Sequence, residues 1–271
     1  AFDAYSLLIE ADGRSLFYTG DLRAHGRKAA LFEDLLRRPP EVDVLMMEGT
    51  HVRADGGHDD SRFATESELE DRLVELIGTK AGAVVVLGSA QNLDRLVTTY
   101  RAAKRSDRQL VVDLYGATVA AAAMASIPQP GLDGLRVWVP QRQRVKVKQA
   151  QAFERVEWIK PCRVFPEELA QRPERFVFHV TSSAAPELLR HGALDSDGQV
   201  LWSLWSGYLD QPSGLRLRRE LTDSGVPFDH WHTSGHASVT DLRRLVDALT
   251  PGAVVPMHSE ATQRFADLFP K

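Results

Sequence analysis

Four polar residues follow apolar runs at widely separated positions in this 271-residue sequence. They are Asp21, Glu48, His236 and His258. Each apolar run has the length and composition of a β-strand, so each polar side chain is expected at or just beyond the carboxyl end of a strand. Ligands of α/β proteins bind at that edge of the sheet. The four residues are therefore the first candidates for a functional site.

Two carboxylates and two imidazoles that lie close together are suited to hydrolysis assisted by a divalent metal ion. Asp21 and His258 offer hard and borderline donors, which suit Zn²⁺ or Mn²⁺. Taken singly, the residues have simpler explanations, because Gly20-Asp21 is a common turn and Ser234-Gly235-His236 before a helix is a common cap. The metal hypothesis depends on finding four such residues at four strand ends.

The elements that must position these residues follow an α/β pattern. Asp12-Gly13 predicts a hairpin turn. Further along, continuous apolar strands alternate with amphipathic helices, which indicates a parallel sheet covered on both faces. We expect strands at 5–10, 15–19, 42–47, 83–87, 109–114, 175–180, 199–205, 228–231 and 253–257, and helices at 31–37, 66–78, 92–104, 118–126, 186–191, 215–224 and 239–249.

Composition excludes several classes of protein. The sequence is 43% hydrophobic and 26% charged, which is typical of a folded globular chain. One cysteine, Cys162, excludes an internal disulfide framework and a thiolate-rich zinc site, and a cytoplasmic location is expected. The net charge of −4 argues against bulk non-specific binding to nucleic acid but allows a local basic surface. No apolar run approaches the roughly 18 residues of a membrane helix, so no membrane partner is expected.

Four short motifs surround the candidate residues. They are Tyr18-Thr19-Gly20-Asp21, Met47-Glu48-Gly49-Thr50, Thr233-Ser234-Gly235-His236-Ala237-Ser238 and Pro256-Met257-His258-Ser259-Glu260. In this order they resemble the motifs of metallo-β-lactamase-fold nucleases of the β-CASP group, which includes ribonuclease J and other RNA-processing enzymes. The resemblance implies an α/β protein made of an incomplete metallo-β-lactamase αββα sandwich, its C-terminal part, with an inserted β-CASP domain whose sheet is mainly parallel. It implies metallo-β-lactamase segments at 1–52 and 213–271 and the insert at 53–212.

The resemblance also implies roles for the four residues. Asp21 would bridge two divalent metal ions, with Zn²⁺ preferred to Mn²⁺, and His258 would bind the second ion. Glu48 and His236 would be the catalytic pair, in which the carboxylate orients the imidazole that protonates the leaving oxygen. The implied activity is that of a zinc-dependent ribonuclease or phosphodiesterase acting on RNA, with single-stranded DNA as the alternative substrate. We expect the four side chains to cluster in one cleft between the two domains.

The sequence departs from that family in one respect. The histidine-rich metal motif His-x-His-x-Asp-His is absent from the 271 residues, and the sequence begins with Ala1. We therefore expect this chain to be part of a longer enzyme, in which an N-terminal segment or a second chain completes the metal site. Separately, the sequence leaves a homo-oligomer open as an assembly. With so few ligands the isolated chain should bind metal weakly and be inactive or impaired. Two alternatives stay open: a non-catalytic remnant or subunit that binds RNA or a partner, and a metallo-hydrolase of small molecules.

Several further residues are weaker candidates for contacts to RNA or phosphate. Ser182 and Ser183 follow a strand and could offer hydroxyl groups to a phosphate, as could Ser234. Arg142 and Arg144 belong to a basic run that suits an RNA backbone. A capping turn and a solvated helix face explain these patterns equally simply. His25 and His51 lie near enough to the motifs to support the residues that bind metal or substrate.

Overall fold

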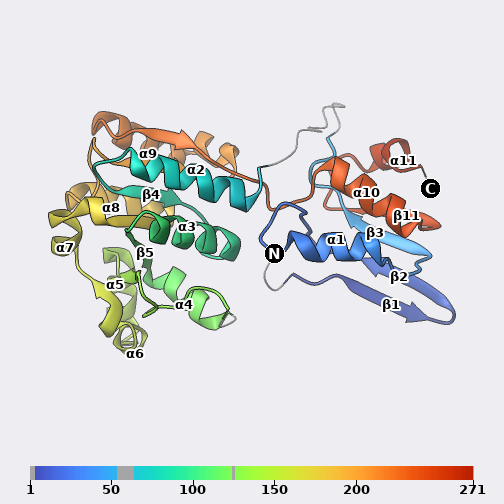
Figure 1. The fold of residues 1–271 in the computed structure, drawn as a ribbon, viewed down its shortest axis with the longest axis horizontal. Helices are drawn as coiled ribbons and strands as arrows, with labels where there is room; N and C mark the ends of the chain where they lie inside the picture. The colour runs from blue at the N-terminus through green and yellow to red at the C-terminus, as the bar shows by residue number, and fades with distance from the viewer. Residues whose placement is uncertain (1–3, 54–63, 124–125, 271) are drawn as a thin grey trace. The chain divides into compact units, whose positions relative to one another are not determined.

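A computed structural model describes residues 4–53, 64–123 and 126–270 (Figure 1). The chain forms two units, one made of Ala1–Glu66 with Thr233–Lys271 and the other of Ser67–His232. The second unit is shifted from the insert predicted at 53–212. Its last strand, β10 (Phe228–His230), pairs with β9 (Gln199–Trp202), and this pairing moves the predicted boundary at residue 212 to residue 232. At the other boundary, the Glu66 N–H donates to the His25 carbonyl at 3.1 Å, which ties Glu66 to the first unit.

The first unit contains a four-stranded sheet in the order β1-β2-β3-β11. β1 and β2 form the antiparallel hairpin predicted from Asp12-Gly13, and both turn residues have positive φ, at 50° and 74°. β2, β3 and β11 run parallel to one another. The elements of this unit are β1 (Leu7–Ala11), β2 (Arg14–Tyr18), α1 (Ala29–Arg37), β3 (Val44–Glu48), α10 (Val239–Leu249), β11 (Ala253–Met257) and α11 (Phe265–Leu268).

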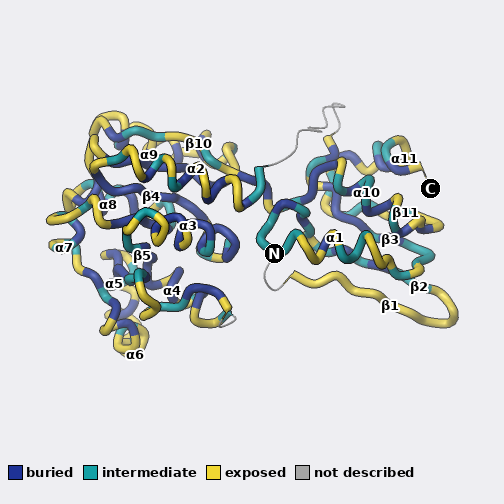
Figure 2. The backbone as a smooth tube through the Cα atoms, in the orientation of Figure 1, coloured by how far each residue is buried: buried dark blue, intermediate teal, exposed yellow. Residues whose placement is uncertain are grey.

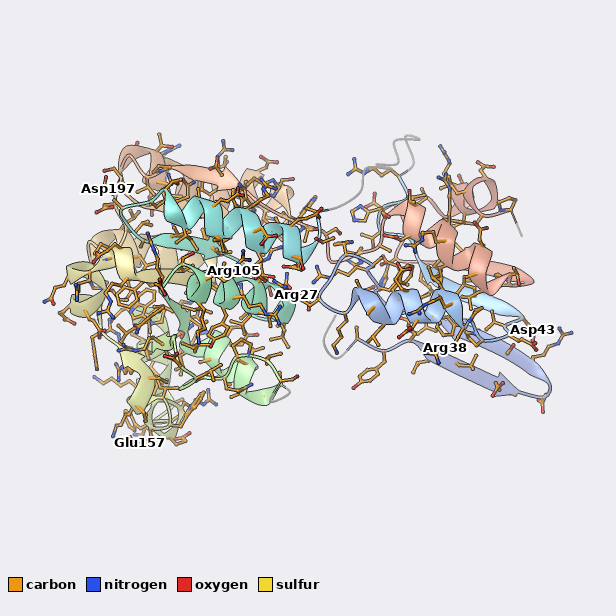
Figure 3. All side chains as sticks on the ribbon, viewed as in Figure 1. Arg27, Arg38, Asp43, Arg105, Glu157 and Asp197 are labelled. Carbon is orange, nitrogen blue, oxygen red and sulfur yellow. The ribbon has the colours of Figure 1, made fainter. Side chains whose placement is uncertain are left out.

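Helices cover one face of this sheet. Phe32 of α1 and Leu245 of α10 are buried in one apolar cluster with Phe17, Leu45 and other strand residues. Asp43, labelled in Figure 3, ties β2 to β3 by accepting the Ser15 N–H at 2.7 Å. β1 is exposed along its whole length (Figure 2). The α/β architecture with a mostly parallel sheet is confirmed, whereas the αββα sandwich stays a prediction.

The second unit is built on a seven-stranded sheet in which every pair of neighbouring strands is parallel. The strand order is β10-β9-β4-β8-β5-β6-β7. Its further elements are α2 (Glu66–Gly78), β4 (Val84–Leu87), α3 (Leu93–Arg105), β5 (Gln109–Asp113), α4 (Leu114–Ala122), β6 (Leu135–Trp138), α5 (Gln141–Gln149), α6 (Glu154–Glu157), β7 (Arg163–Val164), α7 (Pro166–Gln171), β8 (Phe176–Val180), α8 (Ala185–Arg190) and α9 (Pro212–Asp223).

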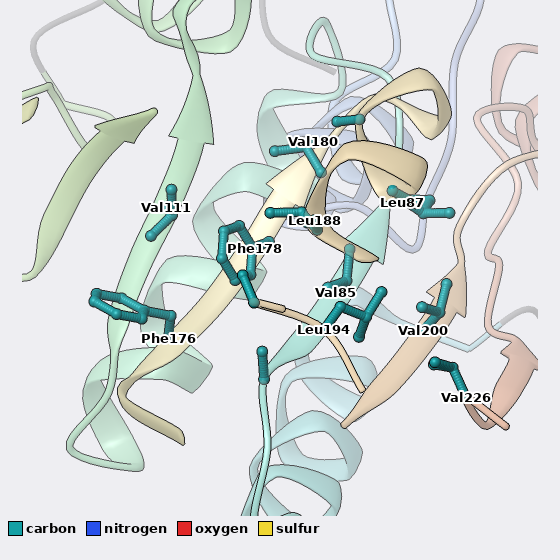
Figure 4. Close-up of a cluster of buried hydrophobic side chains, with 14 of the residues drawn as sticks. Val85, Leu87, Val111, Phe176, Phe178, Val180, Leu188, Leu194, Val200 and Val226 are labelled. Carbon is teal, nitrogen blue, oxygen red and sulfur yellow. The ribbon is translucent and has the colours of Figure 1, made fainter. Parts of the chain in front are cut away.

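The central strands of this sheet are fully buried, as continuous apolar strands require when both faces are covered. Figure 4 shows part of the core on one face, where Leu188 of α8 lies with Val85, Phe178 and Val200. The mainly parallel sheet of the predicted insert is therefore confirmed, although its membership of the β-CASP group is not tested by the fold.

Two predicted elements need correction, and some elements were not predicted. The helix predicted at 118–126 begins earlier, at Leu114, because the Asp113 side chain caps it by accepting the Gly116 N–H at 2.7 Å. The strand predicted at 199–205 ends at Trp202, since a 3₁₀ turn occupies 206–210. Strand β6 was not predicted, because an arginine interrupts its apolar residues. Helix α5 was not predicted, because the basic run that forms it has only two apolar residues. Among the described helices, none combines the length and the apolar character needed to cross a bilayer.

Candidate active site

Three of the four predicted site residues lie at one edge of the sheet in the first unit. Because β2, β3 and β11 are parallel, their carboxyl ends share this edge. Met257 pairs with Glu48, which puts His258 one residue beyond this pair, and Asp21 follows β2 by three residues. His236 arrives from the segment that precedes α10. The four side chains come together within this unit.

Glu48 is the buried centre of the cluster, with 1% of its surface exposed. Its Oε1 accepts two backbone hydrogen bonds, from the N–H of Leu22 at 3.2 Å and that of Ala237 at 3.0 Å. Its Oε2 lies 3.0 Å from Nδ1 of His236. These contacts hold the carboxylate in one orientation and connect two loops that are distant in sequence.

His236 is held by its Nδ1 atom. The hydroxyl oxygen of Thr50 lies 3.2 Å from the same nitrogen that contacts Glu48. The hydrogen bond to Glu48 raises the pKa of His236 above its usual value, and the charges of Glu48 and Asp21 add to this effect while burial opposes it. An imidazole that uses Nδ1 in this way offers Nε2 to a substrate and is biased toward its protonated form.

Asp21 and His258 form a second pair in the same cluster. Asp21 Oδ1 lies 3.1 Å from Nδ1 of His258 and 4.0 Å from Nδ1 of His236. The turn before Asp21 needs glycine, because Gly20 has φ +58° and a Cβ there would come within 2.9 Å of the Tyr5 carbonyl oxygen. His258 also has a positive φ, 48°, which is uncommon for a residue other than glycine.

The loop that carries His236 is fixed by residues that the sequence analysis largely missed. The Ser234 carbonyl accepts hydrogen bonds from Arg23 Nη1 at 3.1 Å and lies 2.7 Å from His25 Nε2. The Ser234 hydroxyl lies 2.6 Å from His51 Nε2 and accepts the His236 N–H at 3.0 Å. His25 and His51 thus support the loop that carries His236, near the motifs as predicted. Nothing in the sequence pattern indicated the contact made by Arg23.

This arrangement argues against a phosphate contact by Ser234. The residue is 8% exposed, and its hydroxyl is already used by His51 and by the His236 backbone. Burial lowers the pKa of both His25 and His51, so these imidazoles support the loop in their neutral form. The geometry favours Ser234 as a structural residue of the loop.

The other weak candidates lie in the second unit. Arg142 and Ser183 line one cavity there, and Ser182 is in the adjoining 3₁₀ turn, residues Ser182–Ala184. Arg144 instead forms an ion pair with Glu187 at 3.5 Å. None of these residues belongs to the unit that contains Asp21 and His236.

Asp21 and His258 offer one oxygen donor and one nitrogen donor to a metal ion. Two ligand atoms that share one Zn²⁺ lie about 3.0–3.4 Å apart, given bonds of about 2.1 Å and near-tetrahedral or smaller angles. The 3.1 Å between Asp21 and His258 agrees with this spacing. However, the described residues contain no group of three or more His, Cys, Asp or Glu side chains placed to hold a metal. The pair fits one ion in type and spacing but not in number of ligands.

Comparison with known families finds a similarity in the C-terminal part of the chain. Residues 229–270 match the model of the Zn-dependent metallo-hydrolase RNA specificity domain. This segment contains both His236 and His258. The match is confined to this segment and shows its similarity to that domain, while the assignment to the β-CASP group remains a prediction. No curated protein matches the chain.

Among solved structures, a protein of unknown function from Enterococcus faecalis V583 has a similar fold. It is 18% identical with a TM-score of 0.72, and the alignment covers 97% of this chain and 57% of that protein. This chain therefore spans little more than half of its length. The Hef helicase domain of Pyrococcus furiosus aligns with a TM-score of only 0.28 at 11% identity, covering 73% of this chain and 39% of that one. That similarity is too low to support a comparison.

Proposed function

We propose that this chain provides part of the active site of a metal-dependent phosphodiester hydrolase that processes RNA, in the manner of the β-CASP nucleases. One observation supports the proposal above others. The Glu48–His236 pair, with its 3.0 Å contact, lies beside the Asp21–His258 pair, and both histidines fall inside the matched metallo-hydrolase segment.

His236 would act as a general acid. Its Nδ1 is occupied by Glu48, so Nε2 would face the leaving oxygen of the scissile phosphodiester. The contact with Glu48 raises the pKa of His236 and so favours the protonated ring, whose proton could pass to the leaving oxygen as the bond to phosphorus breaks. Proton transfer of this kind contributes about 10²–10⁴-fold to the rate. Glu48 orients the ring and stabilises its positive charge.

Asp21 and His258 would bind the metal. A bound divalent ion would supply hydroxide at neutral pH and stabilise negative charge on the phosphate. Because catalytic zinc sites use three protein ligands and the described residues supply two, further ligands must come from elsewhere. The His-x-His-x-Asp-His motif is not in these 271 residues, so the isolated chain would be impaired. The shortage of ligands also favours, as the second candidate, a non-catalytic RNA-binding role.

The test compares two histidine variants in the intact gene product, with RNA cleavage and metal content measured together. We expect His258→Ala to lower both metal content and cleavage. We expect His236→Ala to lower turnover about 10²–10⁴-fold while metal content stays nearly unchanged. His230→Ala is the control, because His230 lies on β10 in the second unit.

Other results would contradict the proposal. Unchanged metal content in His258→Ala would remove this residue from the ligand set. RNA binding without cleavage in the metal-loaded intact protein would support the non-catalytic alternative. Cleavage of small phosphodiesters or esters but not of RNA would support the small-molecule hydrolase.

A further inference from the structure

The second unit contains a cavity of about 800 Å³ at the carboxyl ends of β5, β6 and β8. Its walls come from the start of α4, from α5 and α6, and from the turn after β8. Figure 3 labels Glu157 in α6, one of the short helices of this unit. A volume of this size suits a small ligand, because pockets for such molecules are typically about 300–1,000 Å³.

The topology of the sheet favours a ligand at this position. From β5 the chain continues through α4 to β6, whereas from the neighbouring strand β8 it continues through α8 to β9, in the opposite direction along the sheet. Since crossovers between parallel strands are right-handed, α4 and α8 lie on opposite faces. The ends of β5 and β8 therefore flank a crevice of the kind in which α/β proteins bind ligands.

Three cationic side chains line this cavity. Arg142 and Lys146 lie one turn apart on α5, and Arg155 belongs to α6. Within the part of the chain that the structure describes, none of these three side chains forms an ion pair, whereas the neighbouring Arg144 pairs with Glu187 at 3.5 Å. Positive charges that line one concave surface attract anions, because the low-dielectric walls focus their field.

The two acidic residues of the wall do not offset this charge. Asp113 is 1% exposed, its Oδ1 accepts the Gly116 N–H at 2.7 Å, and burial raises its pKa. The carboxylate of Glu187 accepts the Gln141 N–H at 2.8 and 2.9 Å and pairs with Arg144. Both carboxyl groups are thus engaged by the protein itself, so the cavity presents a positive surface to a ligand.

Two aromatic side chains complete the lining. Tyr115 is 47% exposed and Trp158 is 42% exposed, which is high for side chains of this size. The Trp158 indole N–H donates to the Arg155 carbonyl at 3.0 Å, which orients the ring. Leu114 and Val147 add apolar surface to the same walls. Exposed aromatic faces beside a cationic surface are suited to stacking against a nucleobase.

We propose that this cavity binds a nucleotide through its phosphate and the face of its base, without selecting among the bases. The phosphate lies near Arg142, Lys146 and Arg155, and the base stacks on Tyr115 or Trp158. Stacking tolerates any base, because every base has a π face. The nucleotide is either a free nucleoside monophosphate or one unit of a single-stranded RNA. The proposal does not depend on hydrolysis in the first unit, because every residue involved lies in the second unit.

Titration calorimetry of the 271-residue chain with AMP, UMP, adenosine and inorganic phosphate at low salt tests the two parts of the ligand. We expect AMP to bind at least tenfold more tightly than adenosine, which lacks the phosphate, and than inorganic phosphate, which lacks the base. AMP and UMP should bind within tenfold of one another. Adenosine or inorganic phosphate that binds as tightly as AMP would overturn the proposal, as would a larger difference between AMP and UMP.

A matched pair of variants on α5 tests the contact with the phosphate. Lys146→Ala should weaken AMP binding at least fivefold. Lys148→Ala removes the same charge from the same helix outside the cavity, so it should leave AMP binding nearly unchanged. Arg155→Gln is a second variant on another helix, and it should weaken AMP in the same direction as Lys146→Ala. Equal effects of the two lysine variants would contradict a specific phosphate contact in the cavity.

A matched pair of tryptophan variants tests the contact with the base. Trp158→Ala should weaken AMP binding at least fivefold, because stacking on an aromatic ring is lost. Trp205 is 61% exposed and lies outside the cavity, so Trp205→Ala should leave AMP binding nearly unchanged. Tyr115→Ala covers the other ring. If neither Trp158→Ala nor Tyr115→Ala weakens AMP more than Trp205→Ala does, the base does not stack in this cavity and the proposal fails.

The same assay identifies the source of the nucleotide and separates this site from the hydrolase. An oligoadenylate that binds at least tenfold more tightly than AMP, with the same loss in Lys146→Ala, assigns the cavity to RNA. A smaller difference assigns it to the free nucleotide, and absence of binding by both ligands refutes the site. His236→Ala should leave nucleotide binding unchanged, so this proposal and the proposed hydrolase can fail independently.

Discussion

Glu48 accepts hydrogen bonds from one strand-end loop and from the loop before α10. Its two carboxylate oxygens contact the backbone of Leu22 and Ala237 and the ring of His236. A buried carboxylate is costly unless such donors compensate for lost hydration. The same contacts that make the burial of Glu48 tolerable also fix the direction of the His236 ring, so the stability and the geometry of the candidate site depend on one group.

His25 leads to a prediction about pH. Burial lowers its pKa below the usual 6.5, so between that lower value and 6.5 the unfolded chain binds a proton that the folded chain does not. The free energy of unfolding should therefore fall as the pH decreases below 6.5. His25→Gln can retain a donor to the Ser234 carbonyl but cannot titrate, so urea unfolding between pH 5 and 8 should show a weaker pH dependence for this variant. An unchanged dependence would contradict the prediction.

The sequence pattern identified the candidate residues that belong to distinctive motifs. It did not identify the residues that fix their positions in the structure. Asp21, Glu48, His236 and His258 were selected because each follows an apolar strand. Arg23 contacts Ser234 across 211 residues of sequence. No local pattern reports a contact over such a separation, and an arginine in a polar loop resembles any solvated cation. The roles of Asp21, Glu48, His236 and His258 in catalysis and metal binding remain predictions that the histidine variants described above test.

Helix α10 connects the core of the first unit to the candidate site. Ser238 caps its first turn by accepting the Asp241 N–H at 3.1 Å, and Leu242 and Leu245 are fully buried beneath it. The helix therefore fixes the backbone two residues after His236. Its bounds were predicted correctly because the cap and the apolar periodicity agree.

Removal of this cap should destabilise the first unit. Ser238→Ala should lower the free energy of unfolding by about 1 kcal/mol, since the first turn loses a hydrogen-bond acceptor. Ser224→Ala is the control, because Ser224 is an exposed residue after the end of α9, and it should stay within about 0.5 kcal/mol of the parent. Urea unfolding measures both. Equal losses would show that the cap is not the cause.

Two of the elements that the sequence did not predict, β6 and α5, have a mixed composition. β6 contains Arg136, whose guanidinium donates to the carbonyls of Cys162 and Arg163 at the sheet edge, so a charged residue interrupts the apolar run. α5 presents mostly Arg, Lys and Gln, and of its residues only Val147 is buried. Tertiary contacts, rather than local periodicity, stabilise these two elements.

The two units of the chain have distinct hydrophobic cores. Leu245 belongs to one and Leu188 to the other, and each is fully buried. Substitution of either by alanine should cost about 2–5 kcal/mol, because each leaves a cavity. Hydrogen exchange followed by mass spectrometry should show faster exchange in residues 4–53 and 239–270 for Leu245→Ala, and in residues 84–123 and 135–230 for Leu188→Ala. Faster exchange throughout the chain in both variants would contradict the division into two cooperative units.

The first unit is assembled from two separated stretches of chain, and this has a consequence for biosynthesis. The contact between Asp21 and His258 spans 237 residues, and that between Glu48 and His236 spans 188. At translation rates of about 5–20 residues per second, the ribosome needs roughly 10–50 s to pass from the first partner of each pair to the second. During this interval the nascent polypeptide holds the acidic half of the cluster without the histidine half, so any chemistry at this site begins only after the second unit has been synthesised.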